Sequence, residues 1–152
     1  MKRDIQKILV IKLSALGDFV LALAAMKHIR QVHAGAHITL LTTPPFEALA
    51  KACPYFDAVE IDGKPKGLKA WWDLRKRIKD ARFDRVYDLQ TSSASARIFH
   101  LLQPGAPEWS GIAFGCAIVA AGGAGIGRAG PGRGQGAGPY GLSQCNAVIG
   151  VQ

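Results

Sequence analysis

The sequence has few cysteines, no strongly apolar run of membrane-spanning length and few acidic residues. Only three of its 152 residues are cysteine, and they are widely spaced: Cys53, Cys116 and Cys145. Without a Cys-x-x-Cys pair, neither a disulfide framework nor a zinc site is predicted. Lys12 and Asp18 interrupt the apolar run near the amino terminus, which argues against a secretory signal peptide. The uncharged stretch 109–127 is mostly Gly and Ala, so no transmembrane helix is predicted and a cytoplasmic protein with reduced thiols is expected.

The shortage of acidic residues leaves the chain strongly basic. Nineteen Lys and Arg residues face 11 Asp and Glu residues, for a net charge of +8. Such a charge attracts nucleic acid, anionic lipid or phosphorylated and carboxylated glycans. The basic residues are spread along predicted helices, as at 75–79, which is also typical of a solvated helix face. No helix-turn-helix pattern and no interleaving of basic and aromatic residues on a strand is found, so a nucleic-acid partner is not predicted.

Composition divides the chain at about residue 115. The tail beyond it has no acidic residue and consists largely of Gly, Ala, Pro and Arg. We therefore predict a folded domain at 1–115 and a low-complexity, disordered tail at 116–152. Residues 125–130 match the Gly-x-Gly-x-x-Gly pattern of dinucleotide sites. Pro131 and Gly132 follow where that motif needs a helix, so a cofactor site is not predicted there.

Strand and helix patterns alternate through the first part of the chain. A first strand begins at Lys7, and further strands are predicted at 38–42, 58–61, 85–89 and 112–114. Helices are predicted between them, at 19–33, 46–52, 68–81 and 94–102. In the first helix, the core side is predicted to carry Val20, Leu23, Met26 and Ile29. This alternation predicts an α/β domain, a Rossmann-like parallel sheet with flanking helices. In such a sheet, ligands bind in the crevice outside the carboxyl ends of the strands.

Three segments carry a resemblance to a known family. They read Ile-Lys-Leu-Ser-Ala-Leu-Gly-Asp at 11–18, Cys-Pro-Tyr-Phe-Asp-Ala-Val at 53–59 and Arg-Phe-Asp-Arg-Val-Tyr-Asp-Leu-Gln at 82–90. In this order and spacing they resemble glycosyltransferase family 9, the lipopolysaccharide heptosyltransferases. The likeness covers residues 8–115.

The resemblance implies the amino-terminal half of a GT-B fold, in which two Rossmann-like domains face each other across a cleft. It also implies transfer of heptose from ADP-heptose, with inversion, to the inner core of lipopolysaccharide, with no metal and no cofactor beyond the donor substrate. The sequence agrees in having no clear Asp-x-Asp motif, and the nearest approach, residues 60–62, fits a turn. A cytoplasmic location follows, with peripheral contact at the inner membrane compatible with it.

Asp18 resembles the catalytic base of the family. In an inverting transfer, a carboxylate takes the proton of the acceptor hydroxyl as its oxygen attacks the anomeric carbon. The alternative is that Asp18 only caps the following helix. Ser14 and Gly17 are expected to border the bound acceptor and to shape the turn beside Asp18, Gly17 by adopting a backbone conformation closed to other residues.

Other polar residues are candidates for binding the acceptor. Four of them follow the strand at 85–89: Asp88, Gln90, Thr91 and Ser92. Their alternative role is turn formation and helix capping. Lys64 and Lys66 lie on a loop where they could meet acceptor phosphates or carboxylates, or simply be solvated. The helical pattern places Trp71 on the packed side of its helix and Trp72 on the outward side, and for both a packing role is preferred to sugar binding.

The resemblance stops where the composition changes. The tail consists of residues encoded by GC-rich codons, so we expect a frameshift or truncation rather than a natural low-complexity tail, and a fragment that is inactive alone. Two other functions stay open. The chain could be a small Rossmann-like module that binds an anionic partner without catalysis, or a nucleotide-dependent enzyme that uses the Gly-rich tail.

Overall fold

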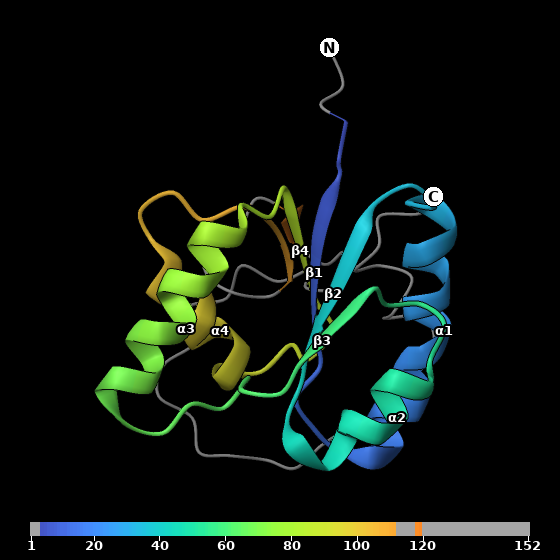
Figure 1. Ribbon diagram of the computed structural model, residues 1–152, viewed down its shortest axis with the longest axis horizontal. Coiled ribbons are helices and arrows are strands. Elements are labelled where there is room, and N and C mark those ends of the chain that lie inside the picture. The colour runs from blue at the N-terminus through green and yellow to red at the C-terminus, as the bar shows by residue number, and fades with distance from the viewer. Residues whose placement is uncertain (1–3, 112–117, 120–152) are drawn as a thin grey trace, which may run out of the picture.

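The computed structural model describes residues 4–111 and 118–119. These residues form a parallel six-stranded sheet of order β3-β2-β1-β4-β5-β6, with helices on both faces (Figure 1). The strands are β1 Lys7–Ile11, β2 His37–Leu41, β3 Ala58–Glu60, β4 Arg85–Asp88, β5 Glu108–Gly111 and β6 Ile118–Val119. The helices are α1 Leu16–Val32, α2 Glu47–Ala52, α3 Gly67–Ala81 and α4 Ser93–Leu102, with a 3₁₀ turn at Pro44–Phe46 before α2. The predicted Rossmann-like α/β class is confirmed.

The central strands are buried on both faces, which explains their continuous apolar sequences. Along β1, Ile8 and Val10 pack with α1 and α2, whereas Leu9 and Ile11 pack with α3 and α4. Figure 1 shows the two layers, with α1 and α2 on one side of the sheet and α3 and α4 on the other. Because alternate residues of a strand point to opposite faces, one short strand anchors both halves of the core.

Helix α1 begins three residues earlier than predicted, and its buried face is rotated from the predicted one. Its buried residues are Phe19, Ala22, Ala25, Met26 and Ile29. Val20, which the pattern assigned to the core side, is 52% exposed. The ring of Phe19 stacks on Phe46 with 5.5 Å between centroids, and this contact fixes which face of α1 turns inward.

The fifth strand lies earlier than predicted. It spans Glu108–Gly111 and pairs with β4, while residues 112–114 lie outside the described part of the chain. Glu108 and Ser110 break the apolar pattern that marks a strand, yet Ser110 is fully buried. Ile118 and Val119, two residues of the predicted tail, pair with β5 as β6. The remaining tail residues lie outside the described part.

The strand order places the switch point of the sheet at β1. The chain moves from β1 to β2 and β3 on one side, then returns through α3 to β4 on the other side. The loops after β1 and β4 therefore leave the sheet side by side and diverge to opposite faces. This is the position where open α/β sheets bind ligands. Within the described residues, no helix has the length and apolar character needed to cross a membrane.

Candidate functional site

The side chain of Gln90 holds the loop between β1 and α1. Its Oε1 accepts hydrogen bonds from the backbone N–H groups of Leu13, at 2.9 Å, and Ser14, at 3.1 Å. Its Nε2 donates to Ser14 Oγ at 3.4 Å. Gln90 and Ser14 are both predicted to contact the acceptor substrate. The structure brings them together, but here they form hydrogen bonds with each other. A primary amide has both a hydrogen-bond acceptor and hydrogen-bond donors. The single side chain of Gln90 therefore holds two consecutive residues of the loop.

Two further contacts fix the same loop. Thr43, after β2, donates its hydroxyl to the Leu13 carbonyl oxygen at 2.8 Å. Gly63, after β3, lies so close that a Cβ atom there would come within 2.2 Å of Leu13 Cδ2 and 2.8 Å of the Thr42 carbonyl oxygen. Only glycine fits this close approach. The loops after β1, β2, β3 and β4 therefore meet at one edge of the sheet.

Asp88, at the end of β4, is fully buried beneath this edge. Its Oδ1 accepts from the N–H groups of Gln90, at 3.1 Å, and Thr91, at 2.9 Å. Thr91 has a φ of 46°, in the left-handed region where a β-branched residue is strained. The carboxylate of Asp88 thus holds a strained turn that aims Gln90 back at the β1–α1 loop. Its predicted alternative role, turn formation, is the one observed.

Burial raises the pKa of Asp88, and the Ser95 hydroxyl, the two turn amides and the Lys12 charge offset part of that rise. The Ser95 hydroxyl lies near the carboxylate but donates to the Ser92 carbonyl oxygen at 3.0 Å, so Asp88 Oδ2 has no hydrogen bond. Lys12 is only 5% exposed, and its Nζ donates to the Leu89 carbonyl oxygen at 3.4 Å. A buried cation and a buried carboxylate therefore lie under the loop.

Asp18 lies above this edge, in the first turn of α1. It is exposed, and within the described part of the chain its carboxylate makes no hydrogen bond or ion pair. The N-cap position of α1 is Ala15, and no side chain caps the helix. Asp18 therefore does not act as a side-chain cap, and its carboxylate is open to a substrate.

Gly17 does not have the predicted role. It lies inside α1 in ordinary helical conformation, and a Cβ atom there would meet no atom within 4 Å. Contacts with Gln90, Thr43 and Gly63 shape the turn instead. The backbone freedom of Gly17 is not used. What Gly17 provides is open space beside Asp18.

The other predicted residues differ in their placement. Ser92 occupies the N-cap position of α4, and its N–H donates to Ser95 Oγ at 3.2 Å. Lys64 and Lys66 are exposed on the loop that begins at Gly63 and contact none of the site residues above. Trp71 packs against the core as expected, but Trp72 is 64% exposed. Trp72 thus lies on the outward side that the helical pattern predicts, without the packing role that was preferred for it.

Three residues of the site were not predicted: Lys12, Thr43 and Gly63. Lys12 could have been found from the sequence, because a charged residue directly after a buried strand rarely points into the core without a partner. Thr43 and Gly63 carried no such signal, since their contacts join loops that are distant in sequence.

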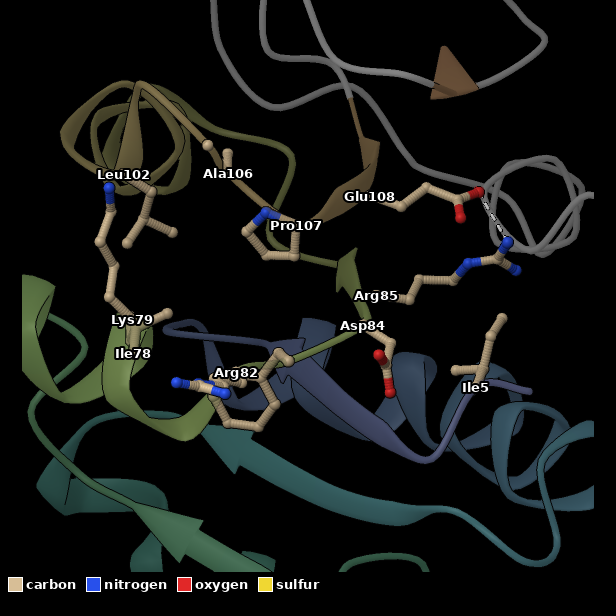
Figure 2. Close-up of a pocket in the computed structure, with 12 residues that line it drawn as sticks. Ile5, Ile78, Lys79, Arg82, Asp84, Arg85, Leu102, Ala106, Pro107 and Glu108 are labelled. Atoms are coloured by element: carbon tan, nitrogen blue, oxygen red, sulfur yellow. Dashed lines mark hydrogen bonds and ion pairs between the residues drawn. The ribbon is translucent and has the colours of Figure 1, made fainter. Parts of the chain in front are cut away.

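A pocket of the described chain lies at the opposite edge of the sheet. It measures about 820 Å³ and is lined by residues at the amino ends of β4 and β5 and the carboxyl ends of α3 and α4 (Figure 2). Its charged residues are largely engaged: Arg85 pairs with Glu108 at 2.6 Å, and Asp84 accepts from the N–H groups of Gln6 and Lys7. Topology favours the edge that carries Asp18, because parallel sheets bind ligands at their carboxyl ends. Among the described residues, no cluster of three potential metal ligands is found.

Comparison with known proteins bears on the family that the sequence resembles. No family model matches the chain. A putative glycosyltransferase of Haemophilus influenzae is 29% identical over 93 residues, 61% of this chain and 27% of the relative. Lipopolysaccharide core heptosyltransferase OpsX of the same organism is 29% identical over 83 residues, 55% of this chain and 24% of the relative.

Two solved glycosyltransferase structures match the fold of this chain. A glycosyl transferase of family 9 from Veillonella parvula matches with a TM-score of 0.61 and 20% identity, covering 72% of this chain and 32% of that one. The E. coli ADP-heptose lipopolysaccharide heptosyltransferase II matches with a TM-score of 0.54 and 24% identity, covering 70% and 30%. The resemblance to glycosyltransferase family 9 is confirmed. The chain spans about a quarter of the length of the curated relatives that it matches.

Proposed function

We propose that this chain carries the acceptor side of an inverting glycosyltransferase that transfers heptose from ADP-heptose to the inner core of lipopolysaccharide. The observation that carries the proposal is the open carboxylate of Asp18 at the switch point of the sheet. It stands beside a loop held by Gln90 and Thr43. A base in a rigid setting is what a proton transfer in the transition state requires.

In the proposed reaction, Asp18 takes the proton from an acceptor hydroxyl while the oxygen of that hydroxyl attacks the anomeric carbon of the donor sugar. The bond from the anomeric carbon to the nucleotide diphosphate breaks on the opposite face, which inverts the configuration. Gly17 leaves room beside Asp18 for the acceptor. Thr91, partly exposed on the neighbouring turn, is the candidate for a hydrogen bond to another acceptor hydroxyl, whereas the hydroxyl oxygen of Ser92 is buried at the N-cap of α4.

The donor and acceptor are inferred from the names of the relatives. One relative is a lipopolysaccharide core heptosyltransferase, and one structural neighbour is an ADP-heptose heptosyltransferase. As the family resemblance implies, a GT-B enzyme holds the donor diphosphate on a second domain that faces this one. We expect such an enzyme to work at the cytoplasmic face of the inner membrane, where it meets the lipid-linked acceptor.

The test is substitution of the base in a full-length relative that carries the same Ser-Ala-Leu-Gly-Asp turn. Asp18→Asn should lower kcat by about 10²-fold or more, with little change in KM for the donor, because general-base catalysis contributes about 10²- to 10⁴-fold. Asp80→Asn is the matched control, since it neutralises an exposed carboxylate near the end of α3, away from the edge that carries Asp18. Near-normal turnover of Asp18→Asn would reject the base and favour a binding module without catalysis.

A further inference from the structure

Helix α3 exposes two large apolar side chains next to a group of lysines. Leu68 is 90% exposed and Trp72 is 64% exposed, although most large apolar residues of the described chain are buried. They are four residues apart, so they lie on the same side of the helix one turn from each other. An exposed apolar pair of this kind costs solubility and points to a surface that binds something.

The charges around this pair have one predominant sign. Lys64 and Lys66 precede the helix, and Lys69 and Lys76 lie on its exposed side. None of these four lysines forms an ion pair with a described residue. We call these four lysines, together with Leu68 and Trp72, the α3 patch.

Nearby acidic groups do little to neutralise the α3 patch. Glu60 and Asp62, before the lysine loop, both pair with Arg77. Asp73 lies on the exposed side of the helix and is the single acidic residue between Lys64 and Lys79. Arg75 places its guanidinium 5.1 Å from the centre of the Trp72 ring, which adds a further cation beside the apolar pair.

We propose that the α3 patch docks on the surface of a bilayer that contains anionic phospholipid. Trp and Leu enter the boundary between headgroups and acyl chains, and the lysines stay among the anionic headgroups. The combination selects this occupant, because a protein partner would be matched by the apolar pair alone and a free polyanion by the lysines alone.

The position of the α3 patch suits a membrane-held acceptor. Helix α3 begins at the carboxyl edge of the sheet, the edge from which α1 and the Gln90 turn also start, at the bottom of Figure 1. Docking there would bring the membrane surface to the side of the molecule that carries Asp18. This consequence rests on the proposed function, whereas the docking itself does not.

The experiment is co-sedimentation of the full 152-residue chain with vesicles of phosphatidylcholine alone or mixed with phosphatidylglycerol. Binding is expected to the mixed vesicles and to weaken with added salt, as electrostatic attraction does. Leu68→Ser with Trp72→Ser should lower the partition coefficient about tenfold or more, from the lost apolar area. Each lysine of the patch changed to Gln should lower it roughly fivefold.

The matched control is Val20→Ser with Leu21→Ser on α1, where two apolar residues are each 52% exposed beside Asp18 rather than beside lysines. This variant should bind as the parent does. Trp72→Phe should keep binding but lose most of the quenching of tryptophan fluorescence by brominated lipid, since Trp109 is fully buried and Trp71 packs against the core. Because all these positions are surface positions, circular dichroism should show an unchanged fold.

Equal binding to both vesicle types would overturn the proposal, as would equal loss in the α1 control. So would a self-association in sedimentation velocity that disappears in the Leu68→Ser, Trp72→Ser variant while vesicle binding is absent, because a second copy would then be the occupant. None of these measurements involves a sugar. An inactive or active Asp18→Asn enzyme therefore leaves the result standing.

Discussion

Gln90 shows how a side chain can be found from the sequence and still be given the wrong partner. Its place after a buried strand predicts that it lies at the carboxyl edge of the sheet, where it does lie. The prediction of a substrate contact does not follow from that place, because the Oε1 atom is used by two amides 76 and 77 residues away. Asp18 differs from Gln90, because its carboxylate has no hydrogen-bond or ion-pair partner among the described residues. This open carboxylate is the structural finding that supports a chemical role for Asp18.

Removing the Gln90 side chain should therefore destabilise the domain. In Gln90→Ala, the N–H groups of Leu13 and Ser14 lose their acceptor in a partly buried place, and an unsatisfied buried donor costs about 1–3 kcal/mol. Urea denaturation followed by circular dichroism measures the change in the free energy of unfolding. Gln31→Ala, on the exposed side of α1, is the control and should change it by less than about 0.5 kcal/mol. Equal effects of the two substitutions would show that Gln90 does not hold the loop.

The elements of the fold were predicted best where one apolar period runs uninterrupted. The strands β1, β2 and β4 are short runs buried on both faces, and their sequences alone identify them. Helix α1 shows the limit, because two apolar sets lie along it and the buried one includes Phe19, whose ring stacks on Phe46 in a contact distant in sequence. Strand β5 was missed because its pairing with β4, rather than its own composition, makes Glu108–Gly111 a strand.

Helix α1 and strand β2 are joined by a clamp whose strength should depend on pH. Arg30 donates to the carbonyl oxygens of Tyr55 and Ala36, and to Asp57 Oδ2 at 2.6 Å. Asp57 Oδ2 also accepts from the N–H of Ile38 at 2.7 Å. The Ile38 N–H and then the Arg30 guanidinium lower the pKa of Asp57 below its ordinary value of 3.8.

A lowered pKa means that the unfolded chain binds a proton more readily than the folded one. The stabilisation by Asp57 is therefore complete above its ordinary pKa and is lost as the pH falls through the lowered value. Asp57→Ala should cost about 1 kcal/mol at neutral pH, a modest figure because the side chain is 41% exposed and solvent screens the pair.

Urea denaturation of Asp57→Ala and the parent at a series of pH values from neutral to acid checks this dependence. The difference between them should shrink toward acid. Asp73→Ala, which removes an exposed acidic residue of α3 without such contacts, is the control. A difference that stays constant, or grows, at low pH would contradict the clamp.

The described residues form one side of the proposed reaction site. The sheet presents Asp18 and its supporting loops at one edge, and the chain spans 24–27% of the length of the curated relatives. The strand and helix pattern of the folded part could not reveal that the relatives are longer, because a Rossmann-like domain has its own core and gives no sign of a second domain. The resemblance to a two-domain family was what predicted it.

The 152-residue chain by itself should therefore not transfer heptose. A general base contributes only about 10²- to 10⁴-fold, whereas holding the donor diphosphate and stabilising its departing charge contribute most of the remaining rate. Of the lysines near this edge in the described chain, Lys12 is buried beneath the loop, and Lys64 and Lys66 lie on the loop after β3 rather than in the turn that carries Asp18. The chain is incubated with ADP-heptose and a truncated lipopolysaccharide acceptor, and the product is sought by mass spectrometry. A full-length relative serves as the positive control, and product above the enzyme-free background from the 152 residues alone would show that this side of the site is a catalyst without a second domain.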